Sequence, residues 1–388
     1  MSKLHKKYLS YCSLVFLLGM ALVAALNLVV DPFGAYRTVN IDALRGHRAK
    51  LGDRIAKAEM LRRGPWDVVI LGSSRAQVGI DPSDSLWEGA RVINGALTAT
   101  NLLELAGVME YAAEVSRPKR VIFMVDFLMF DENRAPQSGF AKSRFNTDRS
   151  LAEYHTGSLL GAHATASSWQ VLKDWARSKP SRYDESGHAL GIGHRSKYTA
   201  RYRFKRTLEN FLEGMYAHYL YSPTRVDCFR RLVRTCLANG TELTVAISPV
   251  HALQLEAIRQ AGLWLDFERF KRDLVAVVSQ EEESFSIPVA VWDFTSFAGP
   301  NAEPVPPAED PADMNWYWES SHYKSELGQL VLKRVIGDPQ PVKDWASNFG
   351  TQINAANVEQ HLSKLRRQRE DYVASHPEDM ALLRDIKG

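Results

Sequence analysis

The sequence predicts an α/β fold: a five-stranded parallel sheet with helices on both faces, preceded by one membrane-spanning helix. Three observations carry this prediction. They are an uncharged apolar run near the N-terminus, five short apolar runs rich in β-branched residues, and a helical spacing of apolar residues between those runs. Short runs that are apolar throughout are typical of strands buried on both faces of a parallel sheet, and their alternation with helices is typical of doubly wound folds.

The N-terminal run, Tyr8 to Val30, contains no charged residue in 23 positions. That length can cross a hydrocarbon core of about 30 Å. Lysines precede the run and Asp31 follows it, so the positive-inside rule keeps the first residues in the cytoplasm. We expect a single-pass protein of the inner (cytoplasmic) membrane, with residues 1–31 as stub and anchor and the rest in the periplasm or outside the cell. A signal peptide cleaved near Ala21–Ala25 is the competing interpretation.

The rest of the chain alternates strands and helices. A basic segment ending near Arg63 is expected to be helical, with Leu44, Leu51, Ile55 and Met60 loosely spaced along it. The predicted strands are 68–71, 91–93, 121–125, 243–247 and 289–292. Helices are predicted at about 102–113, 227–237, 252–261, 264–278 and 327–335. This order indicates a flavodoxin-like sheet. We expect the domain to cover 32–340, with a helical insertion at about 129–222 and a polar helical tail over 341–388.

Composition excludes several classes of function. The 388 residues are 45% hydrophobic and 24% charged, as in ordinary globular proteins. A net charge of +3 is too small for a nucleic-acid-binding protein, so we expect no nucleic-acid partner. Three cysteines are too few for a disulfide scaffold. His188 and His194 match no strong metal-binding spacing, and we expect neither a metal nor another cofactor.

Polar residues follow the predicted strands where ligands bind in an open α/β sheet, at the carboxyl ends. They include Ser74 after the first strand, Asn94 after the second, Asp126 after the third and His251 after the fourth. His322 stands before the last helix, with Glu319 three positions earlier. A serine becomes a useful nucleophile beside a base, and the base needs a group that holds its tautomer. Ser74, His322 and Glu319 are therefore candidate catalytic residues, with Asp293 as a rival for the role of Glu319.

At these residues the chain resembles the SGNH (GDSL-like) hydrolase superfamily, and in particular its bacterial membrane-anchored branch of cell-envelope polysaccharide O-acetylation proteins. The resemblance covers patches from about Trp66 to Val335. Gly72-Ser73-Ser74-Arg75 matches the first block and implies Ser74 as nucleophile. Glu319-Ser320-Ser321-His322 matches the late Asp-x-x-His block, with glutamate in place of aspartate. The second block falls near 94–100 and puts Ala99 at the glycine whose amide helps to hold the oxyanion. The third block, normally Gly-x-Asn, reads Met124-Val125-Asp126, and an aspartate cannot donate a hydrogen bond to an oxyanion.

Structural roles compete with each of these assignments. Ser74 could be a turn or N-cap serine, His322 a cap of the last helix, and His251 a helix-start histidine instead of a pocket residue. Asp126 could be an acceptor that ties loops together, and Arg75 could bind an anion or pair with Asp126. The basic and aromatic stretch 195–206 could meet an anionic polymer or lipid headgroups, or could be a solvated helix face with buried aromatics.

The resemblance implies a serine esterase or O-acyltransferase that acts on envelope polysaccharide through an acyl-serine intermediate. Its partners would be the polysaccharide or its acyl-donor system, including a membrane-bound acyltransferase. The alternative is a non-catalytic protein of the same fold that binds glycan or a membrane partner during polymer export, and the altered third block favours it. Hydrolysis of small lipid esters ranks last, because no long apolar channel is evident in the sequence.

Overall fold

The computed structural model describes residues 3–39, 41–48, 53–181, 183–190, 198–337, 349–384 and 386. The chain forms two compact units. Unit 1 comprises residues 1–63 and 138–185, and unit 2 comprises residues 64–137 and 186–388. The insertion expected at about 129–222 therefore contributes residues to both units.

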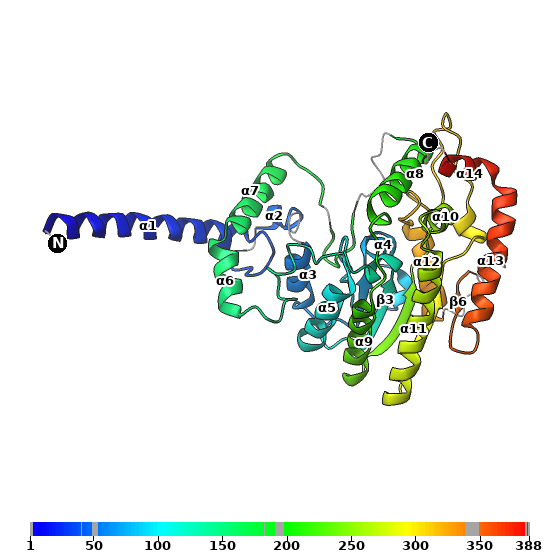
Figure 1. The fold of residues 1–388 in the computed structure, drawn as a ribbon. Coiled ribbons are helices and arrows are strands. Elements are labelled where there is room, and N and C mark those ends of the chain that lie inside the picture. Colours follow the sequence, from blue (N-terminus) through cyan, green and yellow to red (C-terminus); the bar gives the residue numbers. More distant parts are fainter. Residues whose placement is uncertain are drawn as a thin grey trace. The chain divides into compact units, whose positions relative to one another are not determined.

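Unit 1 is helical (Figure 1). It contains α1 (Lys3–Val30), α2 (Asp42–Arg45), α3 (Asp53–Leu61), α6 (Leu151–Leu160) and α7 (Ala162–Ala176). Helix α1 is long and apolar enough to cross a membrane, and α6 and α7 both contact it. The helix expected before Arg63 is two separate helices, α2 and α3, and Leu51 lies outside the described residues.

Unit 2 is built on a six-stranded sheet with the order β2-β1-β3-β4-β5-β6. The strands are β1 (Val68–Gly72), β2 (Val92–Asn94), β3 (Arg120–Val125), β4 (Glu242–Ile247), β5 (Ala290–Asp293) and β6 (Thr351–Gln352). The first five are parallel, and β6 pairs antiparallel with β5. The prediction of a purely parallel five-stranded sheet was therefore wrong, and the sheet is mixed. The sixth strand escaped prediction because it has two polar residues and no apolar run.

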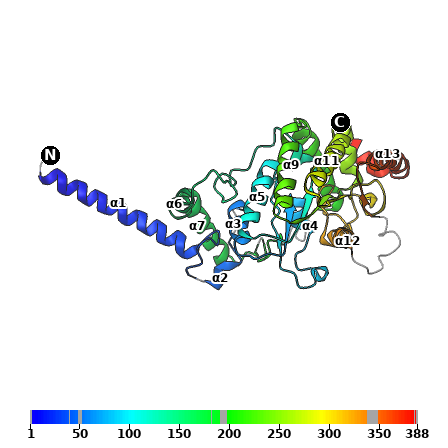
Figure 2. The same ribbon diagram turned by 90° about the horizontal axis from the view of Figure 1, so that it is seen from below.

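Helices cover both faces of this sheet, as Figure 2 shows. On one face lie α5 (Leu102–Val115), α9 (Pro223–Ala238) and α11 (Trp264–Phe285), and α9 contacts both of the others. On the other face α4 (Ser74–Gly79) contacts α12 (Ser325–Ile336). Two further helices, α8 (Ala200–Glu209) and α10 (Ala252–Gln260), pack against each other. Strands β1, β2 and the apolar part of β3 are completely buried, as their unbroken apolar sequences require.

The C-terminal segment is packed against the sheet domain. It holds β6, α13 (Val358–Ser375) and α14 (Pro377–Arg384), and its helix α13 buries Leu362, Leu365 and Tyr372. Arg366 of α13 pairs with Glu268 of α11. The expected boundary at 340 lies outside the described residues.

Candidate active site

The turn between β1 and α4 presents Ser74. Ser73 is the N-cap of α4, and its hydroxyl accepts the backbone N–H of Arg75 at 3.2 Å. Because Ser73 supplies the cap, the hydroxyl of Ser74 is left for another partner. Gly72 permits this sharp turn, since a β-carbon there would lie 2.9 Å from the carbonyl oxygen of Met124.

His322 sits on a tight loop ahead of α12. A bridge between Tyr317 and Tyr323 closes the loop, and the N–H of Trp318 donates to the carbonyl oxygen of His322 at 2.9 Å. The carboxylate of Glu319 accepts the backbone N–H groups of Ser321 at 2.8 Å and of His322 at 2.9 Å. The loop thus fixes the position of both candidate catalytic side chains that it carries.

Close packing of α4 on α12 brings the two segments together. A β-carbon at Gly328 would lie 1.7 Å from the carbonyl oxygen of Gly79, and one at Gly79 would lie 2.0 Å from the ring of Tyr323. Only glycine at both positions allows this approach. Tyr323, which follows His322 directly, is completely buried against α4. Ser74 and His322 are 248 residues apart in the sequence, and this helix contact brings them together in space.

Ser74, His322 and Glu319 form a chain of hydrogen bonds. The Ser74 Oγ lies 2.8 Å from the His322 Nε2, and the His322 Nδ1 is hydrogen-bonded to a carboxylate oxygen of Glu319. Ser74 is half-buried and the side chain of His322 is 30% exposed, so the site is open to solvent. Burial would raise the pKa of Glu319, but the charge of His322 and hydrogen bonds from His322, Ser321 and Thr207 outweigh burial and lower it. A carboxylate that stays ionised can hold the Nδ1–H tautomer, which leaves Nε2 free to accept a proton.

Asp126 accepts hydrogen bonds and offers none to a substrate. It receives the hydroxyl of Ser73 and the guanidinium of Arg75, whose Nη1 lies 2.8 Å from its Oδ1. Arg75 therefore pairs with Asp126, and the ion pair is buried. The same guanidinium donates to the carbonyl oxygen and hydroxyl of Ser321, at 3.0–3.1 Å. Both side chains are buried, so they hold the neighbouring segments in place and are not exposed at the surface of the site.

Ala99 has a backbone conformation that is uncommon for an alanine. Its φ is +51°, in the left-handed region that favours glycine. The residue is half-buried, and its N–H donates to no acceptor within the described part of the chain. The same holds for the N–H of Ser74 in the first turn of α4, where helical N–H groups lack intrahelical partners. Two backbone donors are thus available, one in the turn that carries Ser74 and one in the loop between β2 and α5.

Asn94 and His251 are not pocket residues, which corrects the expectation for both. The amide of Asn94 donates to the carbonyl oxygens of Ala76 and Ile80 at 2.9 Å, so it fastens β2 to α4. His251 is the completely buried N-cap of α10, with its Nδ1 accepting the N–H of Leu253 and its Nε2 donating to the carbonyl oxygen of Glu303. Burial lowers the pKa of His251 to about 4. A histidine of this kind is neutral at pH 7 and serves the fold.

Asp293, the rival for the role of Glu319, belongs to a different cluster. Its carboxylate lies 2.7 Å from both the Nζ of Lys271 and the Nε2 of His361, and it accepts the hydroxyl of Thr295. All of these groups are buried. Burial raises the pKa of Asp293, but Lys271 and His361 together lower it well below its ordinary value. The cluster joins β5 to α11 and α13.

Four polar contacts around the loop that carries Glu319 and His322 were not expected from the sequence. Ser320 donates to the amide oxygen of Gln254 at 2.7 Å, and its carbonyl oxygen accepts the N–H of His251. Thr207 of α8 hydrogen-bonds Glu319, and Arg203 donates to the carbonyl oxygen of Trp318 at 2.8 Å. The only sequence signal was the run of basic residues that includes Arg203, and that run was assigned no role in the site.

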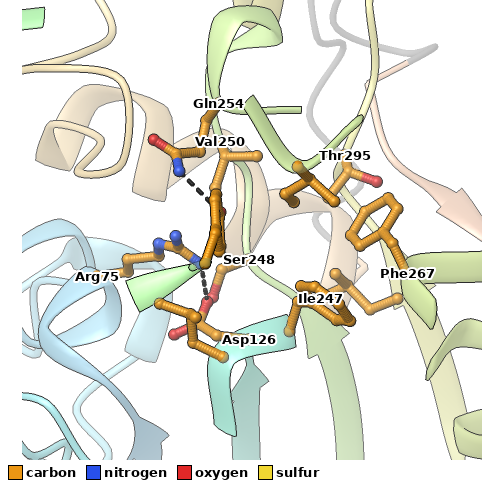
Figure 3. A pocket seen from close by; sticks show the side chains of 12 residues that line it. Arg75, Asp126, Ile247, Ser248, Val250, Gln254, Phe267 and Thr295 are labelled. Carbon is orange, nitrogen blue, oxygen red and sulfur yellow. Dashed lines mark hydrogen bonds and ion pairs between the residues drawn. The ribbon is translucent and has the colours of Figure 1, made fainter. Parts of the chain in front are cut away.

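A cavity of about 10 Å³ lies beneath the site, at the carboxyl ends of β3 and β4. Figure 3 shows Arg75, Asp126, Ser248 and Gln254 around it. This volume holds at most one water molecule, and the buried hydroxyl of Ser248 has no hydrogen-bond partner among the residues that the structure describes. The cavity is therefore too small for a substrate, which must approach the exposed side of Ser74 and His322.

Several of the remaining histidine and basic candidates have structural partners. His188 hydrogen-bonds the carbonyl oxygen of Val78, whereas His194, Arg195 and Lys197 lie outside the described residues. Phe204 is buried against His251. The described residues contain no group of three or more histidine, cysteine or acidic side chains that could hold a metal ion.

Comparison of the sequence with protein-family models and with curated proteins finds no match.

Proposed function

We propose that this chain is a membrane-anchored, extracytoplasmic serine esterase or O-acyltransferase of the SGNH type, acting on cell-envelope polysaccharide through an acyl-Ser74 intermediate. The hydrogen-bond chain from Ser74 through His322 to Glu319 carries this proposal. Ser74 follows β1, and Asp126 follows β3, its neighbour in the sheet. In doubly wound folds of the flavodoxin-like order, ligands bind between two neighbouring strands whose connections run to opposite sides of the sheet. Here that point lies between β1 and β3.

The reaction would begin when the Ser74 Oγ attacks the carbonyl carbon of an acyl ester and gives its proton to the His322 Nε2. The carbonyl π electrons move to the oxygen, and the N–H groups of Ser74 and Ala99 are its donors. Collapse breaks the bond to the leaving alcohol, which takes the proton from His322. An acceptor hydroxyl then attacks the acyl-serine, loses its proton to His322, and Ser74 leaves with that proton. Water as acceptor gives hydrolysis, and a sugar hydroxyl gives transfer.

The third donor of the family's oxyanion site is missing from this proposal. Asparagine at the third block would donate a side-chain N–H, and Asp126 instead accepts hydrogen bonds from Ser73 and Arg75. Loss of one such donor typically costs about 10²–10³ in kcat. A slow enzyme, or one that depends on a reactive donor, fits this site better than a fast general esterase.

The anchor and orientation are part of the same proposal. Lys3, Lys6 and Lys7 on one side of the apolar run favour a cytoplasmic N-terminus, and the catalytic unit then lies in the periplasm or outside the cell. The end of α1 is integrated into unit 1, because Asn27 and Val30 are buried there. This integration favours a retained anchor over a cleaved leader.

The decisive experiment uses the purified full chain in detergent or nanodiscs. We expect a fluorophosphonate probe to label the wild type and Ser284→Ala, an exposed serine control, but not Ser74→Ala. Ser74→Ala should also lose hydrolysis of a chromogenic acetyl ester. If the wild type transfers the acetyl group to a sugar hydroxyl, added glycan should speed up consumption of the ester. His322→Ala should slow labelling by at least 10².

The altered third block favours one second candidate, a non-catalytic glycan-binding protein of the same fold. Absence of both labelling and turnover in the wild type, together with calorimetric binding of envelope glycan, would establish that candidate and exclude the enzyme.

A further inference from the structure

The α6–α7 pair, residues 151–176, is wrapped around the C-terminal end of α1. The side chain of Asn27 donates to the carbonyl oxygen of Leu159 in α6 at 2.7 Å and to the hydroxyl of Thr165 in α7 at 3.1 Å. Ser168 of α7 donates back to Asn27 at 2.8 Å. Asn27 is completely buried by these contacts, so α6 and α7 are fixed to α1 three residues before it ends.

The depth of this contact follows from helix geometry. A helix rises 1.5 Å per residue, so a hydrocarbon core of about 30 Å takes up about 20 residues. If the core begins at Tyr8, it ends near Asn27. Large apolar side chains from Leu4 to Leu22 are exposed along α1, whereas the following turns are partly covered. Figure 1 shows α6 and α7 crossing α1 steeply at this end, as helices lying along a membrane surface would.

The composition of the pair is that of a bilayer interface. From Tyr154 to Leu172 there is no Asp, Glu, Lys or Arg in 19 residues. At the chain's average of 24% charged residues, such a stretch would carry about four or five. The side chains are not hidden in a core either, because Trp169 is 58% and Trp175 49% exposed. A helix surface in water would carry charged residues, and a helix buried in a protein core would not expose its indole rings. The α6–α7 pair fits neither environment.

The positions of the tryptophans match this environment. Residues three or four apart share a helix face, so Trp169 lies beside Thr165 and Leu172, which contact or pack near α1. Lys173 places its ammonium 5.6 Å from the Trp169 ring, and Arg177 is exposed one turn later. Indole rings at headgroup level, flanked by cations that reach lipid phosphates, are typical of membrane interfaces.

We propose that the α6–α7 pair is a membrane-interface element that lies in the headgroup layer of the leaflet where α1 ends, anchored by Trp169 and Trp175. Its ligand is the phospholipid surface. The proposal does not depend on the chemistry of Ser74, but it requires α1 to span the bilayer.

The test places an environment-sensitive nitrobenzoxadiazole label on the full chain in vesicles of phosphatidylcholine and phosphatidylglycerol. Cys228 and Cys236 are buried, and Cys12 is exposed in α1, so the wild type carries the label at Cys12. Two further proteins combine Cys12→Ala with Ala166→Cys, one turn before Trp169, or with Ser284→Cys in unit 2. Lipids with a spin label near the headgroup serve as quenchers.

We expect a blue-shifted emission and at least twofold quenching for the label at position 166, and neither change at position 284. A label at 166 that behaves like the one at 284, while that at Cys12 reports the bilayer, overturns the interface proposal alone. A label at Cys12 that senses water overturns the proposal together with the anchor. Exchange of Trp169 and Trp175 for glutamine should at least halve the quenching at 166, and unchanged quenching removes their anchoring role.

Discussion

Arg75 connects two parts of the candidate site by hydrogen bonds, the end of β3 and the loop that carries His322. From α4, beside the nucleophile, it reaches Asp126 at the end of β3 and both oxygens of Ser321 on the catalytic loop. Its guanidinium is buried and offers five donors in a fixed plane. Lysine could neutralise Asp126 but could not hold Ser321 at the same time.

We therefore expect Arg75→Lys to lower kcat for an acetyl ester by about 10², with little change in KM, because a shift of about 1 Å between His322 and Ser74 has an effect of that size. Hydrogen exchange in residues 316–324 should rise, which provides a readout independent of turnover. Arg231→Lys, at a half-exposed ion pair with Glu110, is the matched control. Unchanged kcat and unchanged exchange would show that Arg75 does not position the loop.

At the residue scale, the sequence indicated which residues lie near the site better than it indicated which way their side chains point. The order of motifs indicated the strand ends, the turn residues and the late histidine. The pairing of Ser74 with His322 was also expected, and the two side chains lie within hydrogen-bond distance. Asn94 and His251 were assigned to the pocket because they follow strands, but each caps or fastens a neighbouring element. A polar residue at a strand end faces either the ligand or its own backbone, and the sequence does not distinguish these two directions.

At the scale of elements, His251 couples the stability of the α10 turn to pH. The folded protein holds it neutral, because burial lowers its pKa to about 4 from an ordinary value of 6.5. The hydrogen bond to the backbone of Glu303 and the charge of Asp379 oppose this shift, and His376 reinforces it. The unfolded chain binds a proton below pH 6.5, and the folded chain binds it only near pH 4. The contribution is complete above pH 6.5 and is lost as the pH falls toward 4.

His251→Asn keeps an N-cap acceptor and removes the titrating ring. Between pH 7 and pH 5 we expect the wild type to lose about 2 kcal/mol more free energy of unfolding than the variant, from roughly 1.5 pH units at 1.36 kcal/mol each. Denaturant unfolding of the full chain in detergent, followed by circular dichroism at both pH values, measures the difference. Equal losses in the two proteins would mean that His251 is protonated in the folded state.

The elements that could not be predicted are those whose stability comes from distant partners. Strand β6 has two residues, and its pairing with Trp292 and Asp293 determines its conformation. The tail that contains α13 was expected to be helical, but its packing was not predicted: His361 of α13 completes the buried cluster of Asp293 and Lys271. Long strands and amphipathic helices carry their own signal in the sequence, whereas a two-residue strand and the partners of a polar helix do not.

For the whole molecule, the proposed membrane anchor and the proposed catalytic site are independent hypotheses. The apolar length of α1 is a property of local sequence, and the convergence of Ser74 with His322 is a property of the sheet domain. Either could hold without the other. Only their combination requires that the proposed acyl-transfer site faces the side of the membrane opposite to Lys3, Lys6 and Lys7.

This orientation can be tested in bacterial cells that express the full chain. We expect the protein to stay in the membrane fraction after an alkaline carbonate wash, because about 20 apolar residues are enough to hold a helix in the bilayer. Protease added to spheroplasts should digest unit 2 and leave a cytoplasmic marker intact. Exchange of Lys3, Lys6 and Lys7 for serine should make part of the population protease-resistant, since those charges set the orientation. The intact mass of the mature protein distinguishes an anchor from a leader cleaved near Ala25. Complete protection of unit 2 in spheroplasts would place the site in the cytoplasm, where envelope polysaccharide outside the membrane could not reach Ser74.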